Sequence, residues 1–172
     1  MRNDSRTDYT KNLKYHQMLY LFNLIIFYIL KLMRFISFHV NSFWYKVTKK
    51  GRSSIIEKIT EDNREKRVEE ALVLFISMEM QDEKNTEILE RAIVEIEKIT
   101  NQLKITNIVI IPYAHLFGKL STLEFAFESF KSIESLLKTQ GFSVTRLPFG
   151  WFNKLDMKAK GHPLSRISRK IR

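Results

Sequence analysis

Two nearly continuous apolar stretches constrain the fold of this chain more than any other feature of its sequence. They are ALVLFISM, Ala71 to Met78, and IVIIPYAHL, Ile108 to Leu116. Runs of this length that are rich in β-forming residues are typical of buried strands. Regular pairing of the second strand is expected to end at Pro112, which lacks a backbone N–H. These strands form the expected centre of a sheet.

Helical periodicity follows each apolar stretch. Asn85 or Thr86 is the expected cap of a first helix. Ser121 and Glu124 fit a capping box for a second helix that stops at Gly141. The inward positions recur at helical spacing, and they are Leu89, Ile93, Ile96, Ile99 and Leu103 in the first helix and Leu123, Phe127, Phe130, Ile133 and Leu137 in the second. Two helices laid on a sheet predict an α/β fold.

Shorter strands are predicted on both sides of this centre. Phe35–Val40 and Phe43–Val47 read as two strands around an Asn41-Ser42 turn. The charge-rich stretch Thr48–Glu70 is expected to be a surface loop or short helix. Downstream, FSVTRL and LDMKAKG supply two more strands, separated by the turn Pro148–Gly150. The expected order is ββ-β-α-β-α-β-β, a single α/β domain with a mixed β-sheet core and two main helices.

The expected domain spans residues 33–172, and residues 1–32 differ from it. They contain the apolar run MLYLFNLIIFYIL, Met18 to Leu30. A spanning helix needs about 20 apolar residues, and no small-residue cleavage site follows the run as in a signal peptide. We interpret residues 1–32 as an extension outside the domain, with Met33 as the functional start. An interfacial helix is the alternative, although membrane association is not expected.

Composition limits the chemistry of the chain. Its 29 Lys and Arg against 19 Asp and Glu give a formal net charge of +10, which favours nucleic acid or an anionic membrane surface as a partner. The chain has no cysteine, so it has no thiol nucleophile or Cys-ligated metal, and a reducing cytoplasm fits. The four histidines show no metal-binding spacing, so we expect neither a metal nor a cofactor.

Two segments carry candidate site residues. His115 lies in YAHL just after a predicted strand, where ligand groups collect in α/β folds, although a histidine satisfied by local hydrogen bonds is an equal alternative. The aromatic segment PFGWF, Pro148 to Phe152, could present N–H groups and ring faces to a nucleobase. Its alternative is a packed hairpin turn.

A basic tract closes the chain. Lys158 and Lys160 share one face of a predicted strand, and Arg166, Arg169, Lys170 and Arg172 extend the tract. Such a tract suits a phosphate track, and a solvated charged sheet edge is the alternative. No paired carboxylates, nucleophile elbow or phosphate-binding glycine loop appears in the sequence.

Several segments together resemble a known family. MRFISFHVNSFWYKV, VEEALVLFISMEMQDEKN, IIPYAHL and PFGWFNKLDMKAKGHPLSRISR occur in the order and approximate spacing of the archaeal-type N-terminal editing domain of threonyl-tRNA synthetase. That domain is related in structure to the D-aminoacyl-tRNA deacylases. The resemblance covers nearly all of the chain after residue 32, and it implies the deacylase fold.

The resemblance also implies an activity, hydrolysis of the ester in mischarged seryl-tRNA(Thr). In the family the terminal adenosine enters a pocket between strand ends, and its ribose 2′-hydroxyl helps to activate a water. Carried onto this sequence, the implied substrate-binding residues are Met78, Ala114, His115, Phe149, Gly150 and Phe152, and the implied tRNA-binding residues are Lys158, Lys160, Arg169 and Lys170. The implied catalytic positions are His115, Asn153 and Arg166, with Lys154 nearby.

Three of these positions depart from the family pattern. The family commonly has tyrosine at Phe152, a functional lysine at Asn153 and an acidic residue at Arg166. Asn153 carries no ammonium to place near the ester, and Lys154 or Arg166 is a candidate to fill the same space. The alternative is a catalytically degenerate module that binds tRNA or a synthetase.

The implied partners are the acceptor end of tRNA(Thr) and a separate catalytic chain of threonyl-tRNA synthetase. The domain is expected to act in trans or as one subunit of a split synthetase, because nothing in this sequence binds ATP or activates threonine. A homodimer remains open on the sequence.

Overall fold

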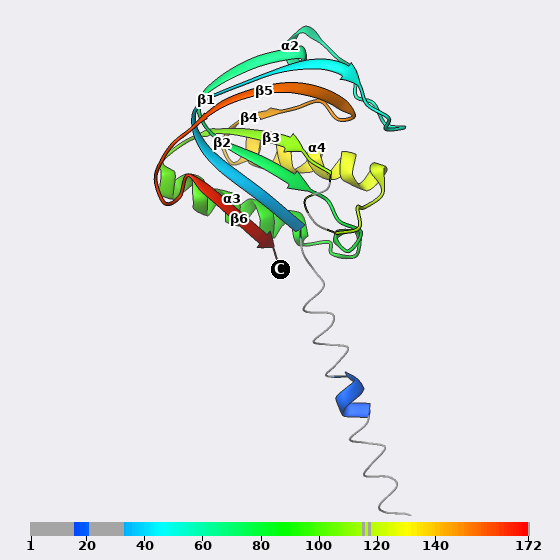
Figure 1. Ribbon diagram of the computed structural model, residues 1–172. Helices are drawn as coiled ribbons and strands as arrows, with labels where there is room; N and C mark the ends of the chain where they lie inside the picture. Colours follow the sequence, from blue (N-terminus) through cyan, green and yellow to red (C-terminus); the bar gives the residue numbers. More distant parts are fainter. Residues whose placement is uncertain (1–15, 21–32, 115, 117, 172) are drawn as a thin grey trace, which may run out of the picture.

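The computed structural model describes residues 16–20, 33–114, 116 and 118–171. Its strands are β1 (Met33–Lys50), β2 (Glu65–Ser77), β3 (Asn107–Pro112), β4 (Ser143–Arg146), β5 (Trp151–Ala159) and β6 (Arg166–Ile171). Its named helices are α2 (Glu61–Arg64), α3 (Ile88–Leu103) and α4 (Leu123–Thr139), with a 3₁₀ turn η1 at Asp82–Lys84. The predicted α/β fold with two main helices is confirmed (Figure 1).

One mixed sheet organises the domain. Its order is β4-β3-β2-β1-β5, and β6 also pairs with β1. Strands β2, β3 and β4 are parallel neighbours, as expected for strands joined by crossover helices, whereas β1 pairs antiparallel with β2, β5 and β6. The carboxyl ends of β2 and β3 therefore meet at one edge of the sheet.

The first strand differs from the prediction. Met33–Lys50 is one long strand, and the predicted turn at Asn41-Ser42 is wrong. Instead, the register shifts between Val40 and Ser42, which is a β-bulge that bends the strand without ending it. Residues 33–38 pair with β6, whereas Val40 and the part of the strand after the bulge pair with β5. A local polar pair cannot distinguish a bulge from a turn, because the outcome depends on strands that come later in the sequence.

The charge-rich stretch Thr48–Glu70 is only partly a loop. Strand β1 continues to Lys50 and β2 begins at Glu65, so strand ends occupy both sides of an irregular segment that holds α2. The basic tail was likewise not predicted as a strand, yet Arg166–Ile171 forms β6 against the start of β1. Ile167 and Ile171 face the core in β6, which explains why this charged segment pairs.

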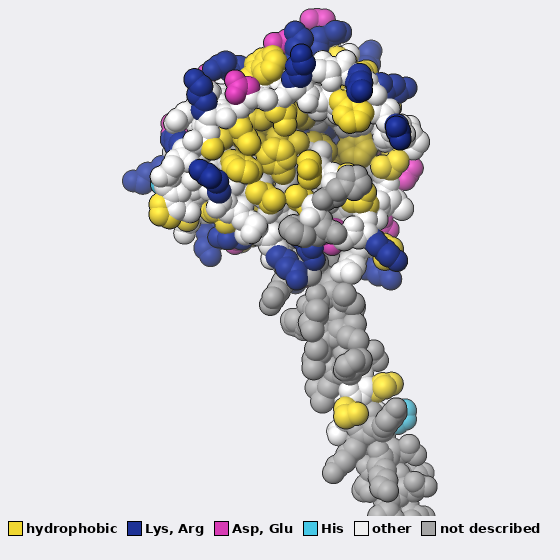
Figure 2. Space-filling view, viewed as in Figure 1, with side chains coloured by type: hydrophobic (Ala, Val, Ile, Leu, Met, Phe, Trp, Pro, Cys, Tyr) yellow, Lys and Arg dark blue, Asp and Glu magenta, His cyan; other side chains and the backbone are white. Residues whose placement is uncertain are grey.

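Both main helices lie on one face of the sheet (Figure 1). Their apolar residues pack with Leu72, Leu74, Ile76, Ile108 and Ile110 of the central strands in the larger hydrophobic cluster. A second cluster, which includes Phe43, Tyr45, Val73, Val109 and Ile111, lies on the opposite face. Figure 2 shows hydrophobic side chains gathered in a hollow of the molecule, with Lys and Arg side chains around its rim.

The helix starts differ from the sequence predictions. Helix α3 begins after Glu87 with no side-chain cap, so Asn85 and Thr86 are not its caps. Helix α4 is capped by Thr122, whose hydroxyl accepts the Phe125 N–H at 3.3 Å, and not by Ser121. Adjacent hydroxyls in Ser121-Thr122 give the same sequence signal, and only the path of the chain selects one. Leu123, predicted to face inward, is exposed.

Residues 1–15 and 21–32 lie outside the described residues, and with them most of the predicted extension, residues 1–32, including most of its apolar run Met18 to Leu30. Among the helices that the structure describes, none is long and apolar enough to cross a membrane.

Candidate functional site

A pocket of about 490 Å³ opens at the carboxyl ends of β2 and β3. Phe75 and Met78 from β2 and its end, with Ile111 to Ala114 from β3 and its end, form the floor. The first turns of α4, the segment Gly51–Ser53 and the turn Leu147–Asn153 form the walls. Ligand sites of α/β proteins commonly lie at this edge of the sheet, so the topology supports a binding site here.

The lining of this pocket is mostly apolar and aromatic. Arg52 is the single charged side chain among its described lining residues, which include no carboxylate. Polar side chains come from Ser53, Tyr113, Ser121 and Asn153. Such a pocket can hold a flat ring and exclude water, with few polar groups to orient the ligand.

The aromatic turn and the segment after β1 are fastened together. The Gly51 N–H donates to the Gly150 carbonyl at 2.8 Å, and a Cβ at Gly51 would lie 2.7 Å from that oxygen. Gly150 has φ of +81°, and a Cβ there would lie 2.5 Å from the Ile55 carbonyl oxygen. Glycine is therefore required at both positions for the two backbones to approach this closely.

Glu57 anchors the same turn from the other side. Its carboxylate accepts the Phe149 N–H at 2.9 Å, and its backbone carbonyl accepts the Trp151 indole N–H at 2.8 Å. The Phe149 N–H, a predicted donor to a nucleobase, is therefore already occupied. The Phe149 ring packs against Phe127 and Phe130 of α4, so this part of the turn belongs to the core.

Arg146 of β4 holds Glu57 in place. Its guanidinium makes a two-point contact with the Glu57 carboxylate at 2.6 and 2.7 Å and a third contact with Glu134 of α4 at 2.6 Å. Burial raises the pKa of Glu57, but hydrogen bonds from Arg146 and Phe149 outweigh it and leave the pKa below its usual value. The wall of the pocket therefore depends on a charge network behind it.

The opposite wall is held by Glu79, which is buried just after β2. Its carboxylate accepts the Gly118 N–H at 3.3 Å and lies 3.5 Å from the Arg34 guanidinium. Backbone bonds from Met80 to Lys119 and from Ser121 to Met78 join the same two loops. Residues 118–121 are thus tied to the chain just after β2.

Most of the predicted substrate-binding residues come together in this pocket. Met78, Ala114, Phe149, Gly150 and Phe152 all line it, although they come from three separate segments. His115, predicted both to bind substrate and to act in catalysis, lies outside the described residues.

Asn153 also lines the pocket. Its Nδ2 donates to the Trp151 carbonyl at 3.1 Å, and its Oδ1 is buried without a hydrogen-bond donor among the described residues. Lys154 and Arg166 are not among the lining residues. Lys154 follows Asn153 in a strand and so faces away, and Arg166 pairs with Phe38 in the distant β6. The structure does not bring either cation to Asn153.

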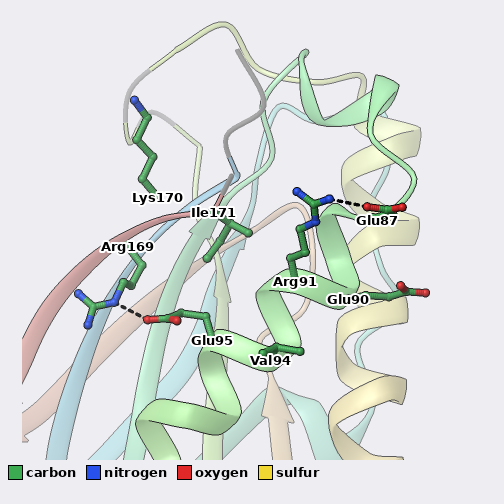
Figure 3. Close-up of a pocket in the computed structure, with 8 residues that line it drawn as sticks. All are labelled: Glu87, Glu90, Arg91, Val94, Glu95, Arg169, Lys170 and Ile171. Carbon is green, nitrogen blue, oxygen red and sulfur yellow. Dashed lines mark hydrogen bonds and ion pairs between the residues drawn. The ribbon is translucent and has the colours of Figure 1, made fainter. Parts of the chain in front are cut away.

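The predicted tRNA-binding residues are dispersed. Lys160 pairs with Glu70, and Arg169 pairs with Glu95 of α3 at 2.6 Å. Arg169 and Lys170 line a second groove, of about 550 Å³, between α3 and β6. Figure 3 shows Glu87, Glu90 and Glu95 in the same groove, so its cations are balanced by carboxylates. Arg172 lies outside the described residues.

His162 of the KGHPL segment has a structural contact. Its Nε2 lies 2.8 Å from Nδ1 of His39 in β1. Burial, followed by the nearby Lys160 and His162 charges, lowers the pKa of His39, which favours a neutral His39 ring at neutral pH. Among the described residues, no group of His, Asp or Glu side chains is arranged to hold a metal ion.

Sequence reasoning missed Arg52 and Glu57 as parts of the site. Both lie in the stretch that was predicted to be a surface loop, and neither belongs to a recognisable motif. The nearby Gly51 was the available signal, because an isolated glycine at a strand end often marks a close backbone approach.

Comparisons with known proteins show which proteins this chain is similar to. Threonine–tRNA ligase of Methanocaldococcus jannaschii is 44% identical over 133 residues, covering 77% of this chain and 21% of the ligase. The corresponding ligase of Methanosphaera stadtmanae is 41% identical over 140 residues, covering 81% of this chain and 22% of the ligase. The chain therefore spans about a fifth of the length of these curated relatives.

A solved structure supports the fold alone. The protein titled c-Myc DNA Unwinding Element Binding Protein matches with a TM-score of 0.53 at 11% identity, covering 79% of this chain and 97% of that chain. The family itself is identified by sequence, since residues 33–171 match the archaea-specific editing domain of threonyl-tRNA synthetase. This chain therefore belongs to the archaea-specific threonyl-tRNA synthetase editing-domain family.

Proposed function

We propose that the pocket at the ends of β2 and β3 hydrolyses the ester of mischarged seryl-tRNA(Thr). The observation that carries this proposal is the meeting of Met78, Ala114, Gly150 and Phe152 around one mostly apolar pocket. These positions match the family's substrate-binding segments, and they come from three parts of the chain. A hydrophobic pocket of this size suits the terminal adenosine with its aminoacyl group.

Activation of the water is assigned to the substrate itself. In the reaction, water adds to the ester carbonyl carbon and the bond between that carbon and the ribose oxygen breaks. A proton from the water passes to the ribose oxygen, which restores the tRNA hydroxyl, and serine leaves as the free acid. No carboxylate lines the described part of the pocket, so this part offers no Asp or Glu side chain as a general base. As the family resemblance implies, the ribose 2′-hydroxyl next to the ester helps to activate the water, and the protein's part is to position the substrate.

The proposal is tested with the full chain and seryl-tRNA(Thr). We expect release of serine well above the no-protein control and slower release from threonyl-tRNA(Thr). A pocket that rejects one methyl group by shape typically discriminates by about 1–3 kcal/mol. Replacing the terminal adenosine with its 2′-deoxy form is expected to abolish release. Equal release with and without protein contradicts the enzyme proposal.

A second candidate function is a non-catalytic module that binds tRNA or a synthetase. Asn153 favours it, because this pocket residue replaces the lysine that is common in the family, and neither Lys154 nor Arg166 lines the described part of the pocket. An Asn153→Lys variant separates the two functions. If the natural chain only binds tRNA and the variant also releases serine, the domain is a binding module that has lost one catalytic group.

We propose that the domain acts on tRNA(Thr) in trans or beside a separate synthetase chain, in the cytoplasm. The matched relatives contain this region as about a fifth of a longer ligase. Adding a threonyl-tRNA synthetase that lacks an editing domain is expected to increase the rate of serine release. Homodimerisation stays a prediction, which analytical ultracentrifugation measures.

A further inference from the structure

The end of β1 reaches the mouth of the pocket with a group of cations. Lys49 and Lys50 close the strand, and Arg52 follows Gly51 on the pocket wall. All three cations are exposed, and the structure shows none of them in an ion pair with a described carboxylate. In contrast, Lys160 and Arg169 of the tail are both paired.

An exposed aromatic ring lies among these cations. Phe152 is 53% exposed, and the Lys49 ammonium lies 5.4 Å from the centre of its ring. The neighbouring backbones are joined, because Lys50 pairs with Trp151 and the Thr48 hydroxyl donates to the Phe152 carbonyl at 3.0 Å. The Phe152 ring and the Lys49 ammonium therefore lie together at the end of β1, where Lys50 and the pocket-lining Arg52 follow Lys49 in sequence. We name the residues Lys49, Lys50, Arg52 and Phe152 the β1-end surface.

We infer that the β1-end surface is the path by which the single-stranded 3′ end of tRNA enters the pocket. This inference rests on the proposed function and adds the route of the substrate. Cations that follow a backbone and an aromatic face that stacks on a base are the two elements of single-strand recognition. Both occur here directly beside the pocket, whereas the groove at β6 is lined by as many carboxylates as cations.

The position of Arg52 gives this path a direction. As the single charged side chain among the described pocket-lining residues, it is placed to contact the phosphate that precedes the bound terminal adenosine. Lys49 and Lys50 lie farther back along β1 and are assigned to earlier phosphates. The exposed face of Phe152 is left for one unpaired base of the 3′ end.

The test compares two triple variants that remove the same charge. One is Lys49→Gln, Lys50→Gln and Arg52→Gln, and the other is Lys158→Gln, Arg166→Gln and Lys170→Gln. Binding of tRNA(Thr) is measured over a range of salt concentrations, for the intact tRNA and for one without its three 3′-terminal nucleotides. Circular dichroism and thermal melting establish that both variants remain folded.

For the first triple variant we expect the slope of log K against log[salt] to fall by about 2, which is about 0.7 for each lost single-strand contact. The affinity of this variant for intact tRNA at low salt falls at least tenfold. The variant and the wild-type protein bind the truncated tRNA equally well. The second triple variant keeps the wild-type slope. If instead only the second variant loses slope, the inference is overturned.

The ring has its own test. Phe152→Leu is expected to weaken binding of intact tRNA(Thr) by about tenfold, because base stacking on an aromatic ring is lost, whereas Phe152→Tyr keeps the affinity. Equal binding by Phe152→Leu and wild type contradicts the stacking role. If wild-type protein does not bind tRNA(Thr), the proposed function fails as well. Normal binding with unchanged slopes overturns the entry path alone.

Discussion

The carboxylate of Glu57 and the guanidinium of Arg146 meet in a two-point ion pair, with oxygen–nitrogen distances of 2.6 and 2.7 Å. Glu57 belongs to an irregular segment and Arg146 to β4, so the pair fastens the segment to the sheet. The Arg146 side chain is only 8% exposed, which makes it the buried centre of the network. The pocket wall is therefore expected to be sensitive to changes that lie behind it.

Arg146→Met is expected to destabilise the domain by about 3 kcal/mol, because it leaves the partly buried carboxylates of Glu57 and Glu134 without their cation. Urea unfolding measures the change. Arg67→Met is the matched control, since its pair with Glu69 is exposed and contributes less than about 1 kcal/mol. Similar losses in both variants contradict a special role for the buried pair.

The same network predicts an acid-sensitive domain. The pKa values of Glu57 and Glu134 are lowered in the folded state, where hydrogen bonds from Arg146 and a second partner outweigh the effect of burial. Their contribution is thus present above the ordinary pKa of 4.5 and is lost as pH falls through the lowered values. Unfolding measured from pH 5 downward is expected to show this loss, and Arg146→Met is expected to flatten it.

Asp82 predicts the opposite slope at higher pH. Burial, with a smaller contribution from the Glu79 charge, raises the pKa of Asp82 from 3.8 to about 6. Protonated Asp82 therefore contributes to the free energy of unfolding, and this contribution is fully present below the ordinary pKa of 3.8. It is lost as pH rises through the raised pKa of about 6, and the total loss is roughly 3 kcal/mol for a shift of this size. Asp82→Asn is expected to remove this dependence between pH 4 and 7. An unchanged pH profile in the variant contradicts the assignment.

Gly150 and Gly141 distinguish backbone strain from steric clash as the cost of adding a side chain. Both have positive φ, but a Cβ at Gly150 would lie 2.5 Å from the Ile55 carbonyl oxygen, and a Cβ at Gly141 meets nothing within 4 Å. Gly141→Ala is expected to cost about 1 kcal/mol from backbone strain alone. Gly150→Ala is expected to cost more and also to weaken ligand binding in the pocket. Thermal unfolding and tRNA binding of the two variants provide the comparison.

At the start of α4, the hydroxyls of Ser121 and Thr122 are expected to differ in their contribution to stability. Thr122→Ala is expected to cost about 1 kcal/mol, because its hydroxyl accepts the Phe125 N–H, whereas Ser121→Ala is expected to be nearly neutral. Chemical denaturation of both variants measures the difference. If Ser121→Ala loses more stability than Thr122→Ala, Ser121 is the cap, as the capping box in the sequence indicates.

The sequence predicted those parts of the fold that depend on local patterns. The buried strands β2 and β3, the end of β3 at Pro112 and the two main helices follow from periodicity and from residues a few positions apart. The bulge at Asn41 and the pairing of β6 did not, because each depends on a partner strand far along the chain. Several residues named from the family segments line one pocket, although they are far apart in sequence.

The remaining features of the site depend on tertiary contacts. Nothing in the residues next to Glu57 indicates that it would meet Arg146, and nothing next to Arg52 indicates that it would be the charged residue of the pocket lining. The tail resembles a phosphate track because its charge is visible in the sequence. The carboxylates of Glu70 and Glu95, which pair with Lys160 and Arg169, come from other elements and are not visible in the same way.

The pairing of Met33 with Ile171 has a consequence for how the domain is made. Strands β2, β3 and β4 with their helices form from one continuous stretch, and contacts that are close in sequence form first. On the ribosome, the floor of the pocket can therefore assemble while the start of β1 still waits for its second neighbour. That edge of the sheet stays open until β6 emerges, so the growing chain is most exposed to aggregation in this last interval.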